Sequence, residues 1–274
     1  LSSANSINWG RLAPQIAYYV SAYCDMVAAG TIAQGDKINV CVPTGNFGNI
    51  LAAYIAKKMG LPVNKFICAS NRNNVLTDFF KKDGEYNRNR DFYTTTSPSM
   101  DILISSNLER LLFFASDFDD RMVAELMAKL NGEGSYKVAS DVFAKIAADF
   151  DAGCCDDKHA AETIHRLWTE EKYLCDTHTA VAVRVYEDYR ARTGDETPTV
   201  IASTASPFKF CRAVIEALGG TLEKDDVTQL DVLTGLTGVP APAPLAALAG
   251  KTPRFDRVVD KADILSTVAL LKDL

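Results

Sequence analysis

The residues best suited to chemistry are the glycines and asparagines of the stretch Pro43-Thr44-Gly45-Asn46-Phe47-Gly48-Asn49. An apolar run at residues 38–42 predicts a short buried strand before them, and a helical pattern follows at residues 50–59. In such a turn, unpaired N–H groups and the positive helix end face one spot, which suits an anion. Asn46 and Asn49 can add side-chain amide donors. The alternative is a plain turn that needs its two glycines only for their backbone angles.

A second strand-to-helix junction places a hydroxyl in a similar position. Residues 199–203 are apolar and β-rich, and Ser206 followed by Pro207 is a strong helix start. Thr204 therefore follows the carboxyl end of a strand, which is the rim where open α/β sheets bind ligands. The glycine loop is expected on the same rim, so the two turns could meet at one ligand. The alternative is a threonine hydroxyl that satisfies local backbone.

Other reactive residue types lack the spacing that their chemistry needs. Seven scattered cysteines, an odd number, indicate reduced thiols in a cytosol and not a disulfide framework. The vicinal pair Cys154-Cys155 has no second pair, and His159 and His165 lie six residues apart instead of four. We therefore predict no metal site.

Length and charge limit the class of protein. With 274 residues, 47% of them hydrophobic, the chain can bury a sizeable core. A net charge of −6 argues against nucleic-acid or anionic-membrane partners. No apolar run reaches the ~20 residues that a membrane helix needs. The chain begins with Leu1 and no signal pattern follows, so we expect a cytoplasmic protein and a start that lies inside a longer one.

The order of the predicted elements indicates the fold class. Strand and helix patterns alternate at residues 38–59 and again at 65–84, which is typical of parallel crossovers. We predict an α/β fold with a doubly wound, mostly parallel sheet, flanking helices, and a helical insertion at about 118–175. This insertion is a candidate for oligomer contacts. Ser106-x-x-Glu109 fits a capping box, which leaves Arg110 as a ligand or a solvated residue.

An amphipathic helix is predicted near the start of the chain, at residues 5–23. Ser6 or Asn8 could cap it, and Pro14 marks either its true start or a kink. The residues expected on its inner face are Leu12, Ile16, Tyr19, Val20 and Tyr23.

Five stretches, in family order over roughly residues 3–210, resemble the threonine synthase family. These enzymes use pyridoxal 5'-phosphate (PLP) and have the tryptophan-synthase-β-like fold, fold type II. Besides the glycine loop, the matching stretches are Asn5-Ser6-Ile7-Asn8-Trp9 with Arg11, Thr95-Thr96-Ser97-Pro98-Ser99-Met100-Asp101-Ile102 leading to Ser106-Asn107-Leu108-Glu109-Arg110, Asp176-Thr177-His178-Thr179-Ala180, and Ser203-Thr204-Ala205-Ser206-Pro207-Phe208-Lys209-Phe210. The chain departs from the family pattern at Thr177, Ser206 and Phe208.

The resemblance implies a role for each matching residue. Gly45, Asn46, Phe47, Gly48 and Asn49 would hold the phosphate of PLP, and the Thr204 hydroxyl would hydrogen-bond its pyridine nitrogen. Asn5, Ser6 and Arg11 would face the phosphate of the substrate; the alternative is two cap residues and a surface arginine. The reaction implied is conversion of O-phosphohomoserine and water to threonine and phosphate.

No catalytic residue is predicted, because the Schiff-base lysine of the family precedes the phosphate loop and nothing in this chain matches it. The sequence Lys81-Lys82-Asp83 is similar to the residues around that lysine, but it follows the loop. It fits the last turn of a helix, where cations complement the helix dipole. We therefore expect residues 1–274 to be the C-terminal part of the large PLP-binding domain, inactive alone. The alternatives are a threonine-synthase-like phospho-lyase and a noncatalytic α/β fragment that binds a phosphate ligand.

Overall fold

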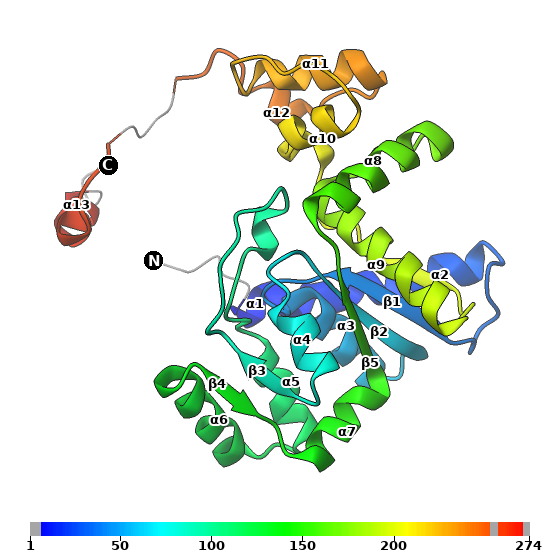
Figure 1. Ribbon diagram of the computed structural model, residues 1–274. Coiled ribbons are helices and arrows are strands. Elements are labelled where there is room, and N and C mark those ends of the chain that lie inside the picture. The colour runs from blue at the N-terminus through cyan, green and yellow to red at the C-terminus, as the bar shows by residue number, and fades with distance from the viewer. Residues whose placement is uncertain (1–6, 253–256, 271–274) are drawn as a thin grey trace.

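The computed structural model describes residues 7–252 and 257–270. Its centre is a four-stranded sheet in the order β5-β2-β1-β6, in which every neighbouring pair is parallel (Figure 1). The strands are β1 (Ile38–Pro43), β2 (Val63–Ser70), β5 (Phe150–Cys154) and β6 (Thr199–Ile201). Every residue of β1 is buried, as expected for a central strand of a sheet covered on both faces.

Alternate residues of the central strands enter two separate hydrophobic cores. Val40 and Val42 of β1 pack in the core that includes α3 (Gly48–Lys58), and Cys41 packs in the core of α9 (Thr177–Thr193). Successive strand residues point to opposite faces, so helices cover both sides of the sheet. The predicted doubly wound α/β fold is confirmed.

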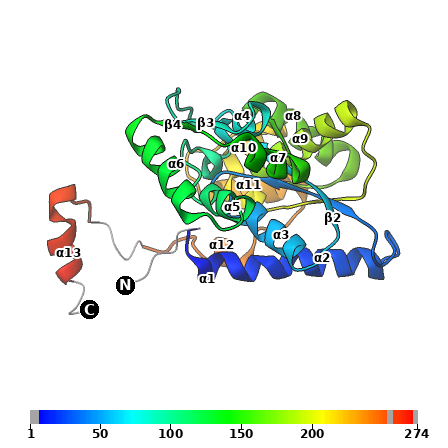
Figure 2. The same ribbon diagram turned by 90° about the horizontal axis from the view of Figure 1, so that it is seen from below.

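The first helical segment runs along one edge of the molecule and is not a single helix (Figure 2). It consists of α1 (Trp9–Leu12), a 3₁₀ turn (Ala13–Gln15) around Pro14, and α2 (Ile16–Ala28). Asn8 caps α1, since its side chain accepts a hydrogen bond of 2.9 Å from the Gly10 amide. Tyr19 is buried as predicted, but Val20 is 43% exposed, so its place on the inner face was wrong.

The predicted helical insertion at about 118–175 is corrected. It contributes β5 to the main sheet, and β4 (Ser135–Lys137) pairs antiparallel with β3 (Glu85–Asn87). The helices of this region are α6 (Asp120–Gly132), α7 (Ser140–Asp149) and α8 (Asp157–Glu171). β5 escaped prediction because Asp151 and Gly153 interrupt its apolar pattern at the edge of the sheet.

The remaining helices complete the chain. They are α4 (Val75–Lys81), α5 (Leu108–Ala115), α10 (Cys211–Ala217), α11 (Thr228–Thr237), α12 (Ala243–Ala246) and α13 (Ile264–Leu270), with 3₁₀ turns at Pro98–Met100, Pro207–Lys209 and Lys261–Asp263. Over the described ranges, none of the helices is long and apolar enough to cross a membrane. Cys41, Cys68 and Cys211 are buried free thiols.

Candidate functional site

The glycine loop and Thr204 border one cavity of about 270 Å³ at the carboxyl ends of β1 and β6. Arg11, Ser99, His178 and Lys209 also line it, together with Gly45 to Asn49. Two turns that are about 155 residues apart in the chain thus meet where the rim of a parallel sheet places its ligands. The particular roles given to these residues stay predictions.

The backbone of the loop is not strained at its glycines. The residue with a left-handed conformation is Phe47, at φ 62°, directly before the first residue of α3. Its ring is buried against Phe80 and Phe150, with centroids 6.2 and 5.8 Å away. This packing can offset the cost of the unfavourable backbone angle. Neither glycine of the loop has a positive φ, so the alternative of glycines needed for backbone angles fails.

Gly45 is required for a different reason, the close approach of another segment. A Cβ atom at this position would lie 2.7 Å from the carbonyl oxygen of Ser99. A side chain on residue 45 would therefore push the 3₁₀ turn at Pro98–Met100 away from the loop.

Two side chains hold the carbonyl groups of the loop. Ser105 Oγ donates to the Gly45 oxygen at 2.7 Å, and Asn107 donates to the Asn46 oxygen from its backbone N at 3.1 Å and its Nδ2 at 2.8 Å. In a trans peptide, C=O and N–H point in opposite directions. The N–H groups of Asn46 and Phe47 therefore point away from these partners, which gives the loop a donor side and an acceptor side.

This arrangement corrects the predicted capping box. The N-cap of α5 is Asn107, its side chain makes no capping bond, and Ser106 Oγ is buried without a partner among the described residues. Asn107 is used to hold the loop instead. Arg110 is half-buried, and its guanidinium donates to Asn107 Oδ1 and, at 2.7 Å, to the Ile7 carbonyl.

The start of α3 adds further donors on the same loop. The first helical bond runs from the Leu51 amide to the Phe47 oxygen at 3.1 Å. Within the described residues, the preceding amides of Gly48, Asn49 and Ile50 have no acceptor. The cavity wall contains two cations, Arg11 and Lys209, and none of its described lining residues is an acid. Open amides, cations and no carboxylate fit a phosphate dianion.

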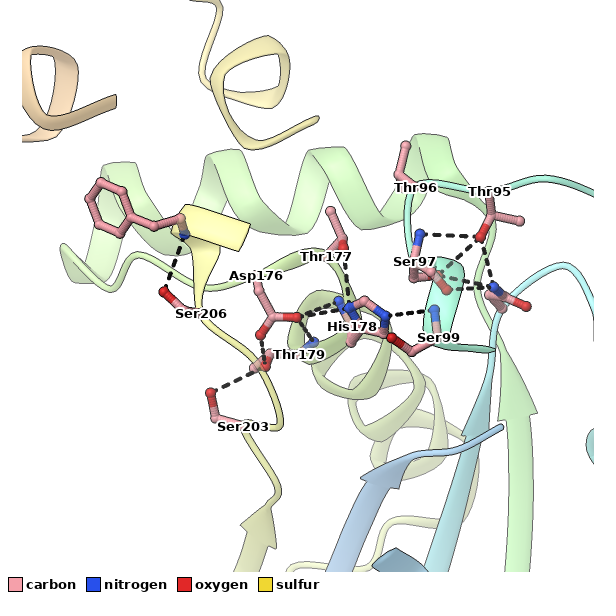
Figure 3. A network of polar contacts seen from close by, with 12 residues as sticks. Thr95, Thr96, Ser97, Ser99, Asp176, Thr177, His178, Thr179, Ser203 and Ser206 are labelled. Atoms are coloured by element: carbon pink, nitrogen blue, oxygen red, sulfur yellow. Dashed lines mark hydrogen bonds and ion pairs between the residues drawn. The ribbon is translucent and has the colours of Figure 1, made fainter. Parts of the chain in front are cut away.

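His178 forms another part of the wall, and its ring is paired with the buried carboxylate of Asp176, which does not itself line the cavity (Figure 3). The Ser99 amide donates to His178 Nε2 at 3.2 Å, so Nε2 is the acceptor and the ring proton is on Nδ1, 3.1 Å from Asp176 Oδ1. Asp176 also caps α9 by accepting from the His178 amide at 2.8 Å. Burial alone would raise the pKa of Asp176, but hydrogen bonds from His178 and Thr179 outweigh it and lower that pKa.

The turn that carries Ser99 is shaped by a buried amide network. Asn71 Nδ2 donates to Thr95 Oγ1 and Asp101 Oδ1, both at 2.8 Å, and Asn73 Nδ2 donates to Asp101 Oδ1 at 2.9 Å. Because both asparagines are buried, these bonds strongly favour one loop conformation.

The structure places the other predicted residues as follows. Arg11 borders the cavity, and Asn5 and Ser6 lie outside the described residues. Lys81 and Lys82 pair with Asp151 and Asp78 at 2.7 and 3.2 Å, away from the cavity.

The described part of the chain contains no group of three or more His, Cys, Asp or Glu residues suited to a metal ion. Sequence reasoning missed His178 and Lys209 as wall residues, although both lie in family-like stretches.

Comparisons with known proteins agree with this geometry. The family model "Threonine synthase, C-terminal" matches residues 179–268. The human protein Threonine synthase-like 1 is 48% identical over 220 residues, which are 80% of this chain and 29% of that protein. Threonine synthase of Corynebacterium glutamicum is 38% identical over 224 residues, covering 80% of this chain and 45% of the relative.

Two solved structures carry the same fold. The yeast threonine synthase superposes with a TM-score of 0.81 at 30% identity, over 98% of this chain and 53% of that one. The PLP-bound threonine synthase of Brucella melitensis has a TM-score of 0.73 at 38% identity, over 85% and 48%. The chain thus spans about half the length of these solved relatives.

The parallel sheet, its flanking helices and the cavity at the carboxyl ends of its strands define a portion of a fold type II PLP enzyme. With the sequence matches added, the chain belongs to the threonine synthase family.

Proposed function

We propose that this chain supplies the PLP-binding wall of a threonine synthase. The observation that supports it is the shared cavity, in which the donor side of the Gly45–Asn49 loop and the Thr204 turn meet without a carboxylate among the described lining residues. A phosphate ester attached to a heterocycle would satisfy both turns at once. As part of this proposal, residues 1–274 belong to the large PLP-binding domain.

Each part of the cavity would have a separate task. The loop amides and the side chains of Asn46 and Asn49 would hold the phosphate, and Thr204 would contact the ring nitrogen. PLP, when bound, supplies an electron sink for the reacting carbon. A hydroxyl cannot keep a proton on the ring nitrogen as a carboxylate would, so Thr204 would leave the ring largely neutral. Arg11, with Asn5 and Ser6, would face the phosphate of the substrate.

The substrate we propose is O-phosphohomoserine, which the whole enzyme would convert with water to threonine and phosphate. This chain has no lysine that matches the Schiff-base lysine of the family and its neighbouring residues. Residues 1–274 alone should therefore not turn over substrate. Lys209 is the one lysine among the described lining residues, and it follows the loop instead of preceding it.

A threonine-synthase-like phospho-lyase is the second candidate. Identity to the human Threonine synthase-like 1 is 48%, against 38% for the Corynebacterium threonine synthase. Such an enzyme would use the same phosphate loop and release phosphate from the same substrate without forming threonine.

The test has two stages. The 274-residue chain is titrated with pyridoxine 5'-phosphate, which lacks the aldehyde and cannot react with surface lysines, and with pyridoxine as the matched ligand without phosphate. A clear preference for the ester supports the site, and equal weak binding refutes it. A polypeptide that joins this chain to the family's lysine is then assayed with PLP and O-phosphohomoserine. Phosphate with threonine selects the synthase, phosphate alone selects the lyase, and ester binding without turnover selects a noncatalytic role.

A further inference from the structure

Tyr19 is the partner of one of the two loop asparagines. It lies in α2, far from the loop in sequence, and its hydroxyl donates to Asn49 Oδ1. Tyr19 is 3% exposed and packs in the core shared by α2 and α3. Burial, followed by the nearby Cys41 thiol, raises the pKa of Tyr19 far above its ordinary value, so the hydroxyl stays protonated. Asn49 Oδ1 is its acceptor among the described residues, and a turned amide would leave this buried O–H without one.

This bond determines which end of the Asn49 amide is available. A primary amide has an acceptor oxygen and a donor nitrogen on opposite sides. Because Oδ1 accepts from Tyr19, Nδ2 is directed elsewhere, and no described residue accepts a hydrogen bond from it. Asn49 borders the loop cavity and also a second cavity that Tyr19 lines, so an amide with Oδ1 toward Tyr19 can present Nδ2 to the loop cavity.

The opposite orientation would harm anion binding. If the amide turned over, its carbonyl oxygen would face the phosphate and repel it. A phenylalanine in place of Tyr19 would fill the same core volume but would not select between the two orientations. The hydroxyl is therefore needed to orient the Asn49 amide and not to fill volume in the core.

We propose that Tyr19 is a positioning residue for phosphate binding: its hydroxyl holds the Asn49 side chain so that Nδ2, and not Oδ1, meets the phosphate ester. The inference rests on the proposed function only in that the cavity binds such an ester. It adds a residue of α2, outside the loop, that acts on the phosphate through the Asn49 side chain.

A matched control lies one turn further along α2. The hydroxyl of Tyr23 is also in the buried face, but it donates to the Asp36 carbonyl at 3.1 Å and accepts from the Gly35 amide at 2.8 Å. Tyr23→Phe therefore removes a buried hydroxyl from the same helix without touching the cavity. Tyr19→Phe and Tyr23→Phe should have comparable unfolding midpoints.

The experiment measures the dissociation constants of pyridoxine 5'-phosphate and pyridoxine for the full 274-residue chain. Tyr19→Phe should weaken the ester about tenfold, equivalent to about 1.4 kcal/mol, and leave pyridoxine unchanged. Tyr23→Phe should change neither. In an Asn49→Ala background, Tyr19→Phe should have less than about a twofold further effect, because its partner is gone.

A second readout follows the bound phosphate by ³¹P NMR. Donors favour the dianion, so the bound ester should have a second pKa below its ordinary value of about 6. Removing an oriented donor should raise it, and the ³¹P shift of the Tyr19→Phe complex should titrate at higher pH than that of the wild type. A purely structural hydroxyl would not move this titration.

The outcomes separate the two hypotheses. If the wild type does not prefer the ester, the proposed function fails. If the wild type prefers it and Tyr19→Phe binds equally well, or if the Tyr19 and Asn49 effects add, the inference is wrong. Should Tyr19→Phe not fold, Asn49→Asp decides. It keeps an acceptor for Tyr19 but puts a carboxylate oxygen in place of Nδ2, so the ester preference should disappear, and a retained preference overturns the inference.

Discussion

The two turns that meet at the cavity are built very differently. The glycine loop is held by Ser105, Asn107 and Tyr19, and the Phe47 ring anchors it in the core. Thr204 is exposed and makes no hydrogen bond with the described residues. A dianion needs several donors fixed in advance, because reorienting each one on binding lowers affinity. A single ring-nitrogen contact needs only one hydroxyl that can rotate.

This difference predicts that affinity comes from the loop and electronic tuning from Thr204. Changes at the loop should affect binding strongly and changes at Thr204 should affect it weakly. The variants below test that division, from the largest expected effect to the smallest.

Asn46→Asp should have the largest effect. It places a carboxylate beside the phosphate, and like charges in contact cost several kcal/mol. We expect a loss of about a hundredfold or more in affinity for pyridoxine 5'-phosphate, measured by calorimetric titration. Asn131→Asp, an exposed residue of α6, makes the same charge change as a control. Unchanged affinity in Asn46→Asp would remove the loop from the site.

Gly45→Ala should disturb the loop sterically. Its Cβ would meet the Ser99 oxygen at 2.7 Å, so the two segments must separate, at a cost of about 1–3 kcal/mol in the free energy of unfolding. The affinity for the ester should fall about tenfold with it. Gly132→Ala, where nothing lies within 4 Å, should leave both quantities nearly unchanged. Urea denaturation and titration measure the two effects, and equal behaviour of the two variants would refute the close approach.

Asp176→Asn should affect stability and its dependence on pH. Folding lowers the pKa of Asp176, so its contribution is fully present above the unfolded pKa of about 4 and is lost as the pH falls through the lower folded value. The variant should lose about 2 kcal/mol at pH 7 and show a flatter acid limb. Asp156→Asn is the control, since that residue caps α8 beside His159 but is exposed. Parallel acid limbs for wild type and Asp176→Asn would contradict the prediction.

Thr204→Ala should have the smallest effect on affinity. Loss of one exposed hydrogen bond is worth about 1 kcal/mol, or roughly fivefold. Stability should stay constant, because the side chain contacts little. The absorption spectrum of bound pyridoxine 5'-phosphate, which reports ring protonation, should shift, and Thr204→Ser should restore it. A loss of affinity as large as that of Asn46→Asp would contradict the prediction that affinity comes from the loop and not from Thr204.

Several elements of the fold could be predicted because their signals are local. The apolar run of β1 and the helix that follows the loop both follow from hydrophobic periodicity and helix end signals. The errors have an equally physical cause. Ser106 and Glu109 fit a capping box, but Asn107 bonds to the loop and α5 begins without that cap. A local rule cannot register a competing partner from another segment.

The sequence by itself determined which donors are present and in what order: a strand, a turn with two asparagines, a helix, and later a hydroxyl before a second helix. These depend on neighbours within a few residues. Only the tertiary structure decided how the donors are oriented. Tyr19 acts on Asn49 across 30 residues, Ser105 on Gly45 across 60, and Ser99 on His178 across 79. Each donor is oriented by the hydrogen-bond partner that packing brings to about 3 Å from it. Such partners come from distant segments, so no periodic pattern in the sequence reveals them.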